Sequence, residues 1–160
     1  LMYSEPLAYF ITFRCYGTWL HGDARGSVDR RMRRNWGDPM IPRTPALECS
    51  EESRLNPASF RLTEPARRVV EAVVGEVCRR RSWTLHAVNP RSNHVHVVVT
   101  APRCAPERVL NSLKSWCTRG FFDHGLIERG RKVWARHGST IYLWTSESLS
   151  AKIQYVQSGQ

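Results

Sequence analysis

Two histidines separated by one residue could do chemistry together. His94 and His96 stand in the run Asn93-His94-Val95-His96-Val97-Val98-Val99. Successive side chains of a β-strand alternate between its two faces, so both imidazoles would project from one face, about 6–7 Å apart at Cβ. Two imidazoles so placed can chelate one metal ion. Two surface histidines on a half-exposed strand would give the same pattern, so both interpretations stand at this point.

The neighbours of the pair favour a metal site. The three valines that alternate with the histidines, Val95, Val97 and Val99, would face the core, and Asn93 would stand at a hairpin edge where it can orient a ligand. Neutral imidazoles suit Mn²⁺, Zn²⁺, Co²⁺ or Ni²⁺ better than Mg²⁺, although phosphate oxygens and water can complete a Mg²⁺ shell. Two ligands alone leave the identity of the metal open.

The elements that must position the pair follow from hydrophobic periodicity and turn residues. They predict strands over residues 8–16, 83–89, 93–101 and 139–144, and helices over residues 65–81, from 106 onward and over 147–158. The order β-α-β-β-α-β-α predicts an α+β fold. We expect a ferredoxin-like, split β-α-β antiparallel sheet with two helices on one face and one extra C-terminal helix.

One segment does not fit this periodicity. We expect a single domain over residues 1–160, carrying a basic loop or insertion at about 22–56, where Gly, Pro and Arg interrupt every pattern. A cluster in this loop combines charge with a stacking ring, as single-strand binders do, although basic loops are often merely solvated. The candidate DNA contacts there are Arg31, Arg33 and Arg34, beside Trp36.

The charge balance points to a polyanionic partner. Lys and Arg number 24 against 14 acidic residues, a formal charge of +10. Nucleic acid is favoured over an anionic membrane, because no run of about 18 apolar residues and no signal-peptide pattern is present. We expect a cytoplasmic protein. The five cysteines form no CxxC pair, which argues against a disulfide framework or a cysteine zinc site. The sequence contains no P-loop motif, which argues against an ATP-driven helicase or kinase.

The histidine run resembles the histidine-hydrophobic-histidine motif of HUH nucleases, in an element order like theirs. The segments Tyr16-Gly17-Thr18-Trp19-Leu20-His21-Gly22-Asp23 and Tyr155-Val156-Gln157-Ser158-Gly159-Gln160 resemble IS200-like single-tyrosine transposases, including those associated with bacterial repeat sequences. The resemblance implies cleavage of single-stranded DNA at hairpin or repeat ends. One tyrosine would form a 5′-phosphotyrosine link and release a 3′-hydroxyl, with a divalent ion, Mg²⁺ or Mn²⁺, in a monomer or homodimer.

This resemblance places the nucleophile in the last helix, where Tyr155 is the only tyrosine. Leu149, Ile153 and Val156 form the apolar stripe of that helix, and Tyr155 points about 120° away from it. A third metal ligand, Gln or Asn, usually follows the tyrosine by four residues, but Gly159 stands there. We therefore expect Gln160 as third ligand, or else a two-histidine site completed by water and DNA.

Two lysines are further candidates for DNA contact. Lys152 stands one helical turn before Tyr155 and could hold a phosphate, and Lys114 could do the same, although either side chain could simply be solvated. Two other functions stay open for the chain. One is a nuclease in which the histidine site activates water and Tyr155 only packs, and the other is a non-catalytic nucleic-acid-binding module.

Overall fold

The computed structural model of the protein describes residues 4–18 and 59–158. Its elements follow the predicted order: β1 (Ala8–Cys15), α2 (Glu64–Arg80), β2 (Thr84–Pro90), β3 (His94–Thr100), α3 (Pro106–Asp123), β4 (Trp134–Leu143) and α4 (Ser146–Gln157). The expected basic loop at 22–56, with Arg31, Arg33 and Arg34, lies outside the described residues.

The four strands form one antiparallel sheet in the order β2-β3-β1-β4. This is the order of the ferredoxin-like, split β-α-β arrangement, so the predicted fold class is confirmed. β1 and β3 are the central pair, and their register sets Thr12 opposite His96 and Arg14 opposite His94. The hairpin between β2 and β3 closes with the amide of Arg91 donating to the carbonyl of His94 at 2.7 Å.

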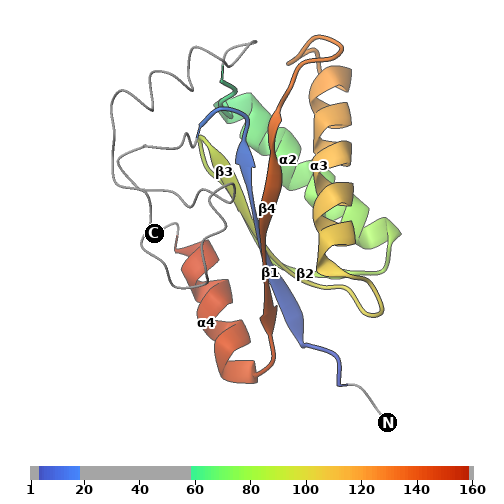
Figure 1. Ribbon diagram of the computed structural model, residues 1–160, viewed down its shortest axis with the longest axis vertical. Helices are drawn as coiled ribbons and strands as arrows, with labels where there is room; N and C mark the ends of the chain where they lie inside the picture. Colours follow the sequence, from blue (N-terminus) through green and yellow to red (C-terminus); the bar gives the residue numbers. More distant parts are fainter. Residues whose placement is uncertain (1–3, 19–58, 159–160) are drawn as a thin grey trace, which may run out of the picture.

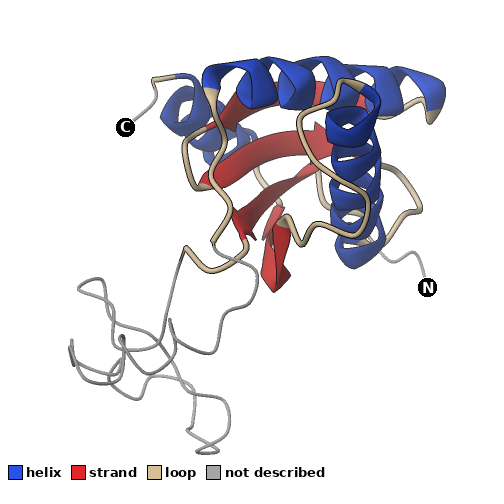
Figure 2. Ribbon diagram, turned by 90° about the horizontal axis from the view of Figure 1, so that it is seen from above, coloured by secondary structure: helices blue, strands red, loops and turns tan. Residues whose placement is uncertain are grey.

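Helices cover both faces of the sheet, and each face has its own core (Figure 1). α2 and α3 pack on one face over Ile11, Phe13 and the odd-numbered valines of β3. The extra helix, α4, packs on the opposite face over a smaller cluster that includes Phe10 and Val98. Seen from above, helices stand on both sides of the strands (Figure 2). The strand alternation expected for the histidine run therefore directs His94 and His96 toward the α4 side.

β4 is longer than predicted, because it begins at Trp134 rather than at residue 139. Its pairing with β1 shifts register between Phe13 and Cys15, and this irregularity removes the alternation that marks a strand in sequence. Gly138 allows the close approach, since a Cβ atom there would lie 2.7 Å from the backbone oxygen of Thr12. Pairing with β1 thus sets the start of β4, which hydrophobic periodicity did not predict.

Two threonines begin helices on opposite faces of the sheet. Thr63 caps α2 by accepting a hydrogen bond from the amide of Ala66, and Thr145 caps α4 in a reciprocal capping box with Ser148. Among the helices of residues 59–158, none is long and apolar enough to cross a membrane.

Candidate functional site

The two histidines lie side by side on the face of β3 that α4 covers. Their ring centroids are 4.6 Å apart, His96 is buried and His94 is half-buried. Val95, Val97 and Val99 are fully buried on the other face, as predicted. The pair is therefore set by strand alternation, in a position where two imidazoles can share one ligand.

Each imidazole is oriented through its Nδ1 atom. Nδ1 of His94 lies 2.6 Å from the side-chain oxygen of Asn93, and Nδ1 of His96 lies 2.8 Å from Oγ1 of Thr12. An amide oxygen only accepts, so a neutral His94 beside it carries its proton on Nδ1 and its lone pair on Nε2. When the Thr12 hydroxyl likewise accepts, His96 has the same tautomer. Fixing Nδ1 in this way is how proteins present Nε2 of histidine to a metal ion.

The surroundings of His96 keep its imidazole neutral. Burial, and then the positive charges of Arg14, Lys152 and Arg91, lower the pKa of His96 to about 4. A neutral imidazole is the form that binds metal ions. The three cations also make this face of the sheet attractive to an anion such as a phosphodiester. Arg14 and Arg91 were not anticipated from the sequence, because only strand pairing brings them to the histidines.

Tyr155 lies beside this pair in the same chain. Its ring centroid is 5.8 Å from that of His96, and the residue is 40% exposed. The neighbouring Val156 is fully buried, with Leu149 and Ile153 packed against the same cluster, so the predicted apolar stripe and the off-stripe position of Tyr155 are confirmed. Asn89 of β2 donates its amide to the Val156 carbonyl at 2.9 Å, which ties the end of α4 to the sheet.

The ring of Phe10, in β1, contacts both His96 and Tyr155. The sequence alone did not identify Phe10 as a residue of the site. Its ring stacks on His96 with centroids 5.3 Å apart, and it meets the Tyr155 ring edge-on at 6.0 Å. Phe10 reads as an ordinary apolar residue of a strand. The one signal in the sequence is alternation, since positions 10, 12 and 14 of β1 must share a face, but the register with β3 was needed to identify that face as the one with the histidines.

The two candidate lysines lie on opposite faces. Nζ of Lys152 stands 4.7 Å from the Phe10 ring centroid and 5.1 Å from that of Tyr155, so Lys152 belongs to the site. Lys114 belongs to α3, and its Nζ donates to the backbone carbonyls of Ala135 and His137 at 2.9 and 3.0 Å. Burial lowers the pKa of Lys114. The structure does not bring Lys114 to the histidines.

The third metal ligand stays a prediction. Gln160 lies outside the described residues, and α4 ends at Gln157 with Ser158 as its C-cap. Within residues 4–18 and 59–158, no third His, Cys, Asp or Glu joins His94 and His96 in a group that could hold a metal ion. A further donor would then be another kind of group, such as an amide, a hydroxyl, a backbone carbonyl, a water or the DNA, or a residue beyond these ranges.

Comparison with known proteins gives one family and one fold. The sequence model of the family described as "Transposase IS200 like" matches residues 59–158. None of the curated proteins matches. A REP-associated tyrosine transposase solved with a REP hairpin is similar, with a TM-score of 0.53 and 12% identity over 98% of this chain and 67% of that one. A candidate transposase from Deinococcus radiodurans has a TM-score of 0.52 and 12% identity over 99% and 94%.

Proposed function

The chain belongs to the IS200-like transposases, and on this premise we propose that it cuts and rejoins single-stranded DNA through a covalent bond to Tyr155. The observation that carries the proposal is the position of Tyr155 beside His96 within one chain, 5.8 Å between ring centroids. A tyrosine serving only as packing would be expected on the buried stripe of α4, whereas this one is exposed and next to the histidine pair.

His94 and His96 fit a divalent cation, which we propose to be Mg²⁺ or Mn²⁺. Both Nδ1 atoms are held by neighbours, and a pKa near 4 leaves the imidazole of His96 available as a neutral ligand at physiological pH. When bound, the ion would polarise the scissile phosphate and offset the negative charge that develops during attack. Gln160, or water and the DNA itself, would complete its coordination.

Tyr155 would supply the nucleophile. Its Oη attacks phosphorus, the bond from phosphorus to O3′ breaks, the phenolic proton leaves to solvent and the departing O3′ takes up a proton. The products are a 5′-phosphotyrosine and a 3′-hydroxyl. A second 3′-hydroxyl can then attack the phosphotyrosine in the reverse sense and join new DNA, because one phosphoester replaces another with little change in energy.

Lys152 would contact the phosphate under attack. Its ammonium lies over the rings of Phe10 and Tyr155, one helical turn before the nucleophile. Arg14 stands opposite His94 in the central strand pair, and both cations add positive charge around His96. Such charges hold a backbone phosphate in register without reading its base sequence.

We propose single-stranded DNA with hairpin or repeat ends as the partner. The formal charge of +10 suits a polyanion, and a protein of the same fold was solved bound to a REP hairpin. The nucleophile and the histidines lie in one chain, which supports a site that a monomer can complete.

A trapping experiment tests the mechanism. Wild-type protein with Mn²⁺ and end-labelled hairpin DNA should give an adduct that survives denaturing electrophoresis. Tyr155→Phe should abolish the adduct and keep DNA binding, while Tyr142→Phe, at another exposed tyrosine, should change neither. The His94→Ala, His96→Ala double variant should bind DNA but form no adduct.

The two alternatives give different outcomes. A nuclease that activates water would still cleave the DNA after Tyr155→Phe, without any adduct in the wild type. A non-catalytic binding module would bind the hairpin and leave it intact in every variant. Either result would overturn the proposed function.

A further inference from the structure

The connection between α3 and β4 carries a row of cations that stand over aromatic rings. Arg129 lies over Phe122 of α3, Arg131 over Phe60 and Lys132 over Tyr16, each 5.4 Å from the ring centroid. The three rings come from three parts of the chain, and the three cations from one short segment. With Arg61, these side chains form what we term the basic rim: Arg61, Arg129, Arg131, Lys132, Tyr16, Phe60 and Phe122.

The rim holds positive charge that the described residues do not neutralise. On α2, by contrast, Arg68 pairs with Glu64, and both Arg79 and Arg80 pair with Glu76. No such ion pair joins the rim cations to a carboxylate within residues 4–18 and 59–158. Among the described residues, the buried Nη1 atom of Arg131 has no hydrogen-bond partner, so these residues compensate the charge of its guanidinium only in part. A negatively charged ligand would neutralise the positive charge that these residues leave uncompensated.

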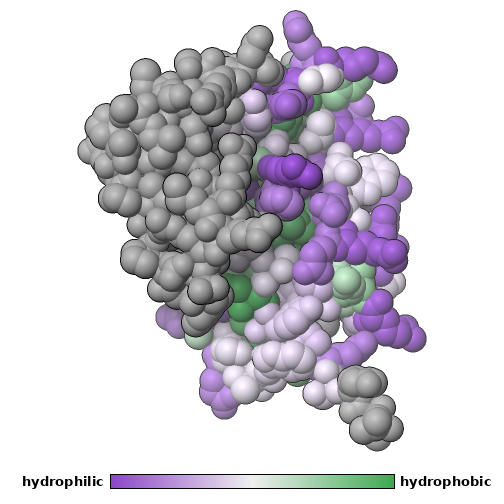
Figure 3. Space-filling model, viewed as in Figure 1, coloured by the Kyte–Doolittle hydropathy of each residue, from purple (hydrophilic) through white to green (hydrophobic). Residues whose placement is uncertain are grey.

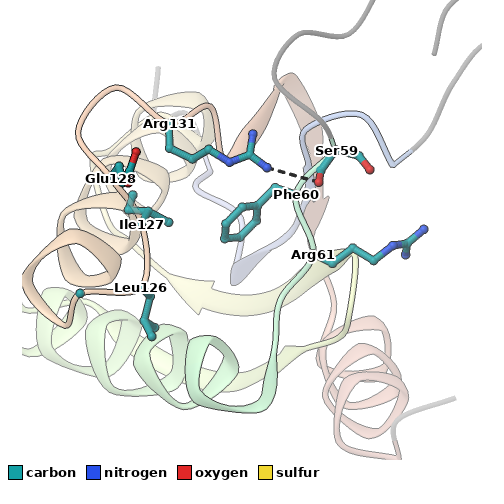
Figure 4. A pocket seen from close by; sticks show the side chains of 8 residues that line it. Ser59, Phe60, Arg61, Leu126, Ile127, Glu128 and Arg131 are labelled. Atoms are coloured by element: carbon teal, nitrogen blue, oxygen red, sulfur yellow. Dashed lines mark hydrogen bonds between the residues drawn. The ribbon is translucent and has the colours of Figure 1, made fainter. Parts of the chain in front are cut away.

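A hollow of about 510 Å³ is lined by Phe60, Arg61 and Arg131 of the rim, together with Ser59 and residues 125–128. Figure 4 shows Arg131 over the Phe60 ring, bonded through Nη2 to the carbonyl of Ser59 at 3.3 Å, with Arg61 pointing away from them. Glu128 is the one carboxylate among the described residues that line the hollow. Strongly hydrophilic side chains gather over the α3–β4 connection at the top of the space-filling view (Figure 3). The rim is thus a charged surface with a recess, not a flat patch.

Backbone hydrogen bonds connect the rim to the histidine strand. The amide of Tyr16 donates to the Val133 carbonyl at 2.7 Å, and the amide of Phe60 donates to the Tyr16 carbonyl at 2.9 Å. The amide of Cys15 donates to the carbonyl of Asn93, the residue before His94, at 2.9 Å. Tyr16 lies two residues beyond Arg14, which is about 7 Å along an extended chain. Tyr16 of the rim therefore lies close to Arg14, which borders the proposed reaction centre.

We propose that the basic rim binds single-stranded DNA flanking the cleaved phosphodiester. Arg129, Arg131 and Lys132 would contact successive backbone phosphates, and the half-buried Tyr16 and exposed Phe122 would offer rings for stacking bases. Charge interleaved with rings is the arrangement that holds unpaired strands, because a duplex already stacks its bases against one another. This inference rests on the proposed function, since it places the flank relative to Tyr155.

A comparison of two double variants with the same charge change tests the inference. Arg129→Gln with Lys132→Gln removes two rim cations, and Arg68→Gln with Arg79→Gln removes two exposed cations from α2. Binding to a hairpin with single-stranded flanks is measured over a range of salt in the Tyr155→Phe background, so that no reaction intervenes. The rim variant should bind about tenfold more weakly, with a salt slope reduced by about 1.4 for two lost contacts to a single strand. The α2 variant should change little.

Shortened DNA locates the flank. Removing the single-stranded segment on one side of the hairpin should abolish the difference between the rim variant and the α2 variant, and that side identifies the strand polarity. Lys132→Arg should retain the wild-type affinity, and the single variants Arg129→Gln and Lys132→Gln should each give part of the loss. These single changes keep the test valid if the double variant folds poorly.

Several outcomes would overturn the inference. Equal binding by the rim and α2 variants would show that the rim does not contact DNA, and an equal loss on blunt duplex would exclude a site for single strands. Failure of the proposed function is separate, because it would appear as a wild-type protein that forms no adduct, whatever the rim variants do. An adduct in the wild type together with unaltered rim variants would refute the rim alone.

Discussion

The position of the His96 ring depends on the apolar side chain of Phe10 as well as on the polar side chain of Thr12. Thr12 fixes Nδ1 of the imidazole, and the Phe10 ring lies against both His96 and Tyr155. Reacting groups need placement to a fraction of an ångström, since a misplacement of about 1 Å can cost about 10²-fold in rate. Phe10 is therefore a positioning residue: it touches neither the DNA nor an ion in the proposed reaction, but it spaces the groups that do.

Replacing Phe10 by Leu should slow adduct formation about tenfold or more, because a smaller, non-planar side chain no longer holds His96 and Tyr155 at their present spacing. The matched control is Phe13→Leu, the same change in the same strand, at a fully buried ring on the opposite face. Single-turnover rates and unfolding midpoints should be measured for both. Similar rates for the two variants, at similar folded fractions, would mean that Phe10 only fills space.

At the scale of elements, α4 is attached to the sheet more lightly than the other helices. Val156 is its one fully buried residue, whereas α2 and α3 each bury several. Partly buried Leu149 and Ile153, the bond from Asn89, and the contacts of Tyr155 and Lys152 with Phe10 add to this attachment, and the capping box at Thr145 holds the first turn. The helix that carries the proposed nucleophile thus depends on local interactions at both of its ends.

Thr145→Ala should weaken α4 without unfolding the domain. Loss of an N-cap costs about 1 kcal/mol, and here the cost falls on a helix with little burial to offset it. We expect faster hydrogen exchange of α4 amides and slower adduct formation. Thr63→Ala removes the equivalent cap of α2 and should lower overall stability by a similar amount while leaving the adduct rate of the folded protein unaltered. Equal effects of both changes on that rate would refute a local role for the α4 cap.

At the scale of the whole molecule, the larger hydrophobic core and the proposed reaction site lie on opposite faces of the sheet. The larger core, under α2 and α3, holds most of the buried side chains, while the face under α4 brings together the histidines, Tyr155 and Lys152. All of these groups belong to one chain. A site assembled within one chain gives a definite expectation for mixtures of defective proteins.

Mixing Tyr155→Phe with the His94→Ala, His96→Ala double variant should restore no adduct formation. Each molecule lacks one half of the site, and a site completed within one chain cannot be repaired by a neighbour. The mixture is compared with each variant alone at matched total concentration, and with wild type diluted by the double variant. Recovery of adduct in the mixture would show instead that tyrosine and histidines act from different chains.

The sequence alone determined what depends on local chemistry. Strand alternation placed His94 and His96 on one face, helical periodicity set Tyr155 off the apolar stripe of the last helix, and the element order predicted the sheet. The family followed from the same motifs. These features can be predicted without knowledge of long-range contacts, because backbone geometry and side-chain periodicity are properties of the chain over a few residues.

Tertiary structure decided which residues meet. The register of β1 with β3 brings Phe10, Thr12 and Arg14 to the histidines, and the docking of α4 sets Tyr155 beside His96. It also turned Lys114 toward carbonyls of β4, a position that helix periodicity alone does not reveal. Pairing register and helix docking arise from packing between segments far apart in the chain, so no local pattern encodes them.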